Sequence, residues 1–228
     1  MKQVVWHFDF VSPFAYLQSC HLDDFLEVAV VRCKPVLFAG LLKHWGHKGP
    51  AEIPPKRKVT FDTIAWLAQR YGLPIRYPAH HPFNPLPLLR LAVADGLATH
   101  AENADKPDSP SVGTVQRIFR FVWQEGHLPT DTQAFTALCH EFGFEPQDLE
   151  SDEVKSRLRV DTEQAIADGV FGVPTSLCFD DADPAARELF WGFDARPMVL
   201  AWGEDDPFFG SAELATARAL PDGIQRRA

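Results

Sequence analysis

The sequence contains few cysteines, and none of them lies close to another. The four cysteines are Cys20, Cys33, Cys139 and Cys178 in a chain of 228 residues, so no CxxC pair is present. This spacing excludes a zinc ribbon and a dithiol redox motif. We therefore expect these side chains to act as small, mostly buried apolar groups.

The sequence also lacks a long apolar run and an excess of positive charge. No run approaches the roughly 20 residues that a membrane-spanning helix needs. The net charge of -9 argues against a general affinity for nucleic acid or anionic membranes. His7 and Asp9 interrupt the apolar stretch that a signal peptide would require. We expect a cytoplasmic protein with neither nucleic acid nor membrane as a partner.

Strand signals occur at the two ends of the chain. Residues 3–10 are rich in Val, Trp and Phe, and residues 27–36 carry a second Val-rich run. Between them, Ser12-Pro13 is a helix-start signal, and apolar spacing continues the helix to about residue 26. This order predicts a βαβ unit with parallel strands.

The middle of the chain, residues 37–168, shows helical spacing and no clear strand. Helices are predicted at residues 59–71, 86–97, 112–122 and 135–142, and a stiff, proline-rich connection at residues 74–87. After this helical region, strands are predicted at 175–179 and 188–191. They flank a polar segment, 180–187, that is predicted to be a long loop. A closing helix is expected at 195–202, and a short helix or loose tail from Ser211 onward.

This order predicts an α/β fold: a thioredoxin-like sheet (βαβ…ββα) interrupted by a large all-helical insertion. The sheet domain would comprise residues 1–38 and 169–228, and the insertion residues 39–168. A four-helix bundle with added strands fits less well, because both ends of the chain carry the strand signals.

Ser12 is the first candidate for chemistry. A hydroxyl at the start of a helix, just after a strand, lies among backbone amides that lack partners and stabilises an anion such as a thiolate. The alternative is that Ser12 only caps the helix.

Pro174, at the start of the next predicted strand, is the second candidate. A cis bond before Pro174 would present the Val173 backbone to a peptide-like ligand, which could pair with it as an added strand does. The alternative is an ordinary proline at a strand edge.

Three segments together, FDFVSPFAYL, GVFGVPT and FWGFD, resemble the 2-hydroxychromene-2-carboxylate isomerases. These are relatives of the kappa-class glutathione transferases in the DsbA-like thioredoxin superfamily. The resemblance covers nearly the whole chain and implies glutathione as the cofactor. It implies Ser12 as the catalytic residue that holds the glutathione sulfur as a thiolate, with Asp194 facing the γ-glutamyl ammonium. The full set of implied cofactor-binding residues is Ser12, Pro13, Phe14, Val173, Pro174, Trp191, Gly192 and Asp194.

The chain departs from the family pattern in two places. Phe193 stands where the family has a polar residue, and no Asn-Arg pair follows Gly49-Pro50. The cations available for a substrate carboxylate are Lys43, Lys48, Lys56 and Arg57, and Asn84 falls near a substrate contact of the family.

Histidines are concentrated in two short segments. His44, His47, His80 and His81 lack carboxylate or thiol partners at ligand spacing, so we predict no metal site. Neutral histidines that line a cleft, one of them a proton carrier, are the preferred interpretation.

The resemblance implies an isomerase that uses glutathione to interconvert 2-hydroxychromene-2-carboxylate-type aromatic acids by reversible thiolate addition. The alternative is a kappa-class-like glutathione transferase or peroxidase, in which the thiolate is consumed. A third alternative is a thioredoxin-like binding or chaperone module without chemistry. A homodimer is a further expectation of the resemblance.

Overall fold

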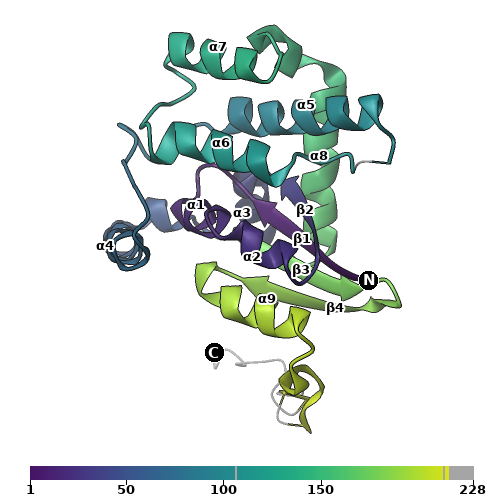
Figure 1. Ribbon diagram of the computed structural model, residues 1–228. Coiled ribbons are helices and arrows are strands. Elements are labelled where there is room, and N and C mark those ends of the chain that lie inside the picture. Colours follow the sequence, from purple (N-terminus) through teal and green to yellow (C-terminus); the bar gives the residue numbers. More distant parts are fainter. Residues whose placement is uncertain (106, 213, 216–228) are drawn as a thin grey trace.

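The computed structural model describes residues 1–105, 107–212 and 214–215, and its centre is a four-stranded sheet of order β2-β1-β3-β4 (Figure 1). The strands are β1 (Lys2–Phe8), β2 (Val30–Pro35), β3 (Thr175–Asp180) and β4 (Asp183–Trp191). β1 pairs with β2 in parallel, and β3 is antiparallel to both β1 and β4. The predicted βαβ unit and the return of the chain to the sheet are confirmed.

Helices fill the long interval between β2 and β3. Figure 1 shows α5, α6 and α7 at one end of the molecule and α9 at the other, with the sheet between them. The α-helices are α1 (Pro13–Ser19), α2 (Leu22–Leu26), α3 (Phe38–Trp45), α4 (Pro54–Tyr71), α5 (Leu86–Glu102), α6 (Val112–Trp123), α7 (Thr132–Glu141), α8 (Asp152–Ala167) and α9 (Arg196–Gly203). Short 3-10 helices are η1 (Pro50–Glu52), η2 (Pro146–Glu150), η3 (Phe193–Ala195) and η4 (Pro207–Gly210). No helix in this described part of the chain has the length and apolar character to cross a membrane.

Two local predictions were wrong. The single helix expected up to residue 26 is two helices, α1 and α2, which meet at Cys20 and His21. The long loop expected at 180–187 is a tight turn, because β4 already begins at Asp183. The Asp180 carboxylate accepts the Ala182 N–H at 2.8 Å and closes that turn. β4 is an edge strand exposed along residues 183–187, so its polar sequence did not indicate a strand.

Our expectation for the chain from Ser211 onward concerns mainly residues 213 and 216–228, which lie outside the described residues.

The two faces of β1 pack against different parts of the molecule. Val4, Trp6 and Phe8 are fully buried in the main core, where Phe119 of α6 lies 5.8 Å from Phe8 between ring centroids. The alternating side chains, such as His7, point to the other face, along which α8 runs. The main core therefore fixes the end of β1 and the turn that follows it.

Gly96 in α5 is packed against the segment that precedes α6. A Cβ on Gly96 would lie 2.6 Å from the Ser109 carbonyl carbon and 2.7 Å from the Pro110 nitrogen. We expect Gly96→Ala to lower the free energy of unfolding by about 1–3 kcal/mol, because backbone has to move to admit one methyl group. Gly113→Ala in α6 is the matched control: the added Cβ meets only the Ser111 hydroxyl, at 3.7 Å. Urea unfolding of both variants tests the packing, and equal stabilities would contradict it.

Candidate active site

Ser12 caps α1 and also reaches the segment before β3. Its Oγ accepts the Ala15 N–H at 3.2 Å and donates to the Val173 carbonyl oxygen at 3.4 Å. The side chain is 7% exposed. Pro13, the first residue of the helix, has no N–H, so the Phe14 amide is the first-turn donor that remains. The turn thus directs the Ser12 hydroxyl toward Val173, with the unpaired Phe14 amide in the first turn of the same helix.

The Val173–Pro174 peptide bond is cis, as predicted. The segment is held on both sides: Gly192 N–H donates to the Pro174 carbonyl at 2.9 Å, and the Thr175 hydroxyl donates to the Gly172 carbonyl at 2.7 Å. Within the described residues the Val173 N–H has no hydrogen-bond partner. The backbone on either side of Val173 is therefore fixed in place.

Asp9 holds the turn between β1 and α1 from inside the core. Its two carboxylate oxygens accept the Val11 N–H at 3.0 Å and the Phe38 N–H at 2.9 Å. The side chain is fully buried. Burial raises the pKa of Asp9 from its ordinary value of 3.8 to about 7, and the two amide hydrogen bonds limit the rise. One carboxylate thus joins the Ser12 turn to the first helix of the insertion.

His81 joins the proline-rich segment to the same turn. Its Nε2 lies 2.9 Å from the Val11 carbonyl oxygen, so this nitrogen carries the proton and donates. Burial lowers the pKa of His81, and the positive charge of Arg57 acts in the same direction. The Tyr16 hydroxyl donates to the Pro74 carbonyl and fixes the other end of this segment. A neutral histidine is therefore hydrogen-bonded to Val11, the residue that precedes Ser12.

A cavity of about 460 Å³ lies between α1, α4 and the segment after β4. It is lined by Phe14, Thr63, Leu67, Tyr71, Phe193, Asp194, Arg196 and Pro197. Gly192 has φ 93°, and a Cβ there would lie 2.5 Å from the Asp194 Oδ1, so glycine leaves room for the carboxylate. Gln18 fixes this loop by donating to the Gly192 carbonyl at 3.2 Å. Phe14 and Asp194, both predicted site residues, therefore share one cavity.

Phe193 stands where the resemblance to the isomerases implied a polar residue, and in the structure it has a packing role. It is buried, and its ring meets Tyr71 edge-on at 5.4 Å between centroids. The neighbouring Trp191 is 55% exposed and packs on Phe171 at 5.1 Å. Phe193 thus anchors the loop, while the Trp191 side chain stays at the surface.

The predicted substrate-binding residues are not gathered in one place. Arg57 lies over the Phe61 ring at 6.0 Å and acts electrostatically on His81. Lys43 and Lys48 are exposed at and beyond the C-terminal end of α3, and within the described residues neither contacts the Ser12 turn. The Asn84 side chain accepts the Leu86 N–H at 3.1 Å, which is a local turn contact at the start of α5.

Sequence reasoning missed Asp9 and Gln18 and gave His81 no specific partner. Asp9 had a signal, since a lone carboxylate between two phenylalanines in a buried strand needs partners. Gln18 and His81 had none, because their partners Gly192 and Val11 are far away in the sequence.

The raised pKa of Asp9 makes folding stability depend on pH in a defined direction. Between about pH 4 and 7 the folded chain keeps a proton on Asp9 that the unfolded chain has lost, so stability falls as pH rises through this window. We expect the stability of the native protein relative to Asp9→Asn to fall by up to about 1.4 kcal/mol per pH unit there. Urea unfolding at pH 5 and pH 8 measures this difference, with the exposed Asp23→Asn as control. The same difference at both pH values would show that Asp9 titrates normally.

Comparisons with known proteins find two groups of relatives that align over most of the chain. A 2-hydroxychromene-2-carboxylate isomerase of Pseudomonas putida is 28% identical over 206 residues, which cover 86% of this chain and 91% of that protein. Glutathione S-transferase kappa 2 of Caenorhabditis elegans is 26% identical over 215 residues, which cover 87% and 90%.

A solved structure of a 2-hydroxychromene-2-carboxylate isomerase superposes with a TM-score of 0.67 at 24% identity, covering 91% of this chain and 98% of that one. The family model of the DSBA-like thioredoxin domain matches residues 3–209. The predicted fold is therefore confirmed, and the chain belongs to the DSBA-like thioredoxin domain family.

Proposed function

We propose that this protein is a glutathione-dependent isomerase of 2-hydroxychromene-2-carboxylate-type aromatic acids. The observation that carries the proposal is the approach of the Ser12 hydroxyl to the Val173 carbonyl, 3.4 Å apart, next to cis-Pro174. Relatives named as isomerases and as kappa-class glutathione transferases align over most of the chain and support it.

The residues present fit a bound glutathione. The Ser12 oxygen already accepts the Ala15 N–H, so its own hydrogen remains for donation. The present acceptor, the Val173 carbonyl at 3.4 Å, makes a long hydrogen bond that a sulfur anion would readily replace. The Val173 backbone would pair with the cysteinyl unit as an added strand does, and Asp194 would face the γ-glutamyl ammonium.

When bound, glutathione would supply a thiolate nucleophile that adds reversibly to a conjugated carbon and so permits rotation about the former double bond. The task of the chain is to keep that sulfur ionised. Ser12 would donate its hydroxyl hydrogen to the sulfur. The Phe14 amide, in the first turn of α1, adds the partial positive charge of the helix N-terminus. The tetrapeptide Ser12-Pro13-Phe14-Ala15 contains no thiol, so no residue of this tetrapeptide competes with the ligand.

Arg57 is the cation we assign to the substrate carboxylate. Its guanidinium lies over Phe61, and its charge reaches His81, which is bonded to the Ser12 turn. Neutral His81 contacts the Phe61 ring edge-on, with 5.1 Å between centroids, and donates to the Val11 carbonyl. All three side chains are exposed, and we prefer Arg57 to Lys43 and Lys48 because its charge acts on His81, which is bonded to the Ser12 turn.

Ser12→Ala tests the role of the hydroxyl. We expect the pKa of bound glutathione to rise by about 1–2 units, because a charge-assisted hydrogen bond contributes about 1.5–3 kcal/mol. Glutathione-dependent turnover at pH 7 should fall at least about tenfold in parallel. Thiolate absorbance during pH titration of the complex reports the pKa. Ser19→Ala is the matched control, since that buried hydroxyl donates to Tyr16 within the same helix. An unchanged thiol pKa in Ser12→Ala would refute the role.

Stoichiometry separates an isomerase from a transferase that uses the same site. We expect many turnovers of a hydroxybenzylidenepyruvate-type acid per glutathione, because elimination returns the thiol, and no turnover without it. Product is followed by absorbance while free thiol is titrated. Loss of one glutathione per product molecule would indicate a transferase. Absence of saturable glutathione binding would rule out both the isomerase and the transferase.

A further inference from the structure

The cavity of about 460 Å³ between α1, α4 and the segment after β4 has two charged side chains in its lining, Asp194 and Arg196. The other lining side chains carry no charge, and they are Phe14, Thr63, Leu67, Tyr71, Phe193 and Pro197. The two charges are opposite, yet within the described residues no ion pair joins them. The proposed binding of glutathione gives a role to Asp194 and none to Arg196.

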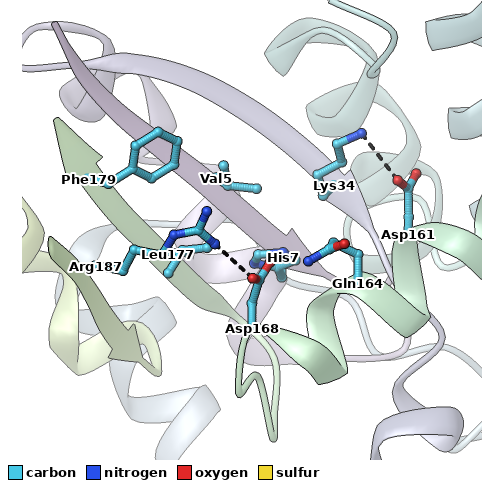
Figure 2. A pocket seen from close by; sticks show the side chains of 9 residues that line it. All are labelled: Val5, His7, Lys34, Asp161, Gln164, Asp168, Leu177, Phe179 and Arg187. Atoms are coloured by element: carbon cyan, nitrogen blue, oxygen red, sulfur yellow. Dashed lines mark hydrogen bonds and ion pairs between the residues drawn. The ribbon is translucent and has the colours of Figure 1, made fainter. Parts of the chain in front are cut away.

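A second cavity, of about 360 Å³, differs in how its charges are paired (Figure 2). It lies around His7, where all four strands and α8 contribute to the lining. The Lys34 Nζ lies 3.2 Å from an Asp161 carboxylate oxygen, and the Arg187 Nη1 lies 2.8 Å from an Asp168 carboxylate oxygen. All four of these side chains line the cavity, as Figure 2 shows. Each cation there is neutralised within the lining, so that cavity presents no unpaired charge to a ligand.

Arg196 is instead anchored from outside its cavity. Its Nε donates to the Asp24 Oδ2 at 3.0 Å, and its Nη2 donates to the same oxygen. Asp24 belongs to α2 and is not part of the lining. The Nη1 of Arg196 has no partner within the described residues, and the side chain is 23% exposed. Because a guanidinium presents donors on two edges, Asp24 holds one edge and the other remains for a second carboxylate.

Asp194 has no such anchor. It is exposed, and in the part of the chain that the structure describes its carboxylate has no hydrogen bond or ion pair. Between Gly192 and Pro197 only Asp194 and Arg196 have polar side chains. Every polar side-chain contact that this loop can make with a ligand therefore comes from these two residues.

We propose that Asp194 and Arg196 together bind a free α-amino acid head group, with Asp194 contacting the ammonium and Arg196 the carboxylate. The two charges of such a group are attached to one carbon, so it fits two opposite charges that line one cavity without neutralising each other. In glutathione this group is the γ-glutamyl end. The inference rests on the proposed function and adds Arg196 as a specificity-determining residue, which selects thiols with a γ-glutamyl unit over thiols that lack it.

Two analogues of glutathione separate the two charges. 4-Aminobutyryl-cysteinylglycine lacks the α-carboxylate, glutaryl-cysteinylglycine lacks the ammonium, and both keep the thiol. In calorimetric titrations of the full-length protein we expect each to bind at least about tenfold more weakly than glutathione, because each leaves one charge of the cavity without its partner. Equal affinity for glutathione and 4-aminobutyryl-cysteinylglycine would overturn the role of Arg196 and leave the proposed function intact. Absence of glutathione binding would overturn both.

Variants assign each charge to its residue. Arg196→Gln should weaken glutathione binding at least about tenfold and remove the preference over 4-aminobutyryl-cysteinylglycine, while the preference over glutaryl-cysteinylglycine remains. Asp194→Asn should show the reverse pattern. Arg187→Gln is the matched control, since it also breaks an arginine–aspartate pair, and it should change neither preference. If Arg196 only supports the fold, Arg196→Gln will weaken all three ligands alike and keep both preferences, and that result would overturn the proposal.

Discussion

Four residues that follow β1, Asp9 to Ser12, are held by hydrogen bonds from several parts of the chain. The buried Asp9 carboxylate binds the amides of Val11 and Phe38, and the Trp123 indole donates to the Phe10 carbonyl at 2.9 Å. These partners belong to the turn itself, to α3 and to α6. A buried carboxylate that only backbone amides satisfy tolerates little movement, because any displaced amide leaves a costly unpaired group. The position of the Ser12 hydroxyl follows from this constraint.

The insertion is bound to the sheet at this same turn. His81 and Tyr16 attach the proline-rich segment at two points, and that segment precedes α5. Under the proposed function, the turn that would ionise a sulfur and the segment that would select a substrate are separate parts of the chain that meet at Val11 and Ser12.

The sequence predicted features that depend on neighbours in the chain. The Ser-Pro helix start, the βαβ unit and cis-Pro174 all depend on residue types that act within a few positions. Prediction from the sequence failed where contacts with other elements determine the local structure. The polar start of β4 forms a strand because β3 offers it hydrogen bonds. The cavity around His7 depends on the register of four strands and on α8, which no local pattern contains.

Serine at position 12 also determines how the protein responds to oxidants. A thiol there would pass to sulfenic acid or to a mixed disulfide, whereas a hydroxyl is inert to both. The three buried cysteines, Cys33, Cys139 and Cys178, have pKa values raised by burial and so carry little of the reactive thiolate. Catalysis through Ser12 would then follow the reduced fraction of the cellular tripeptide pool, with no need for a reductase to restore the polypeptide after stress.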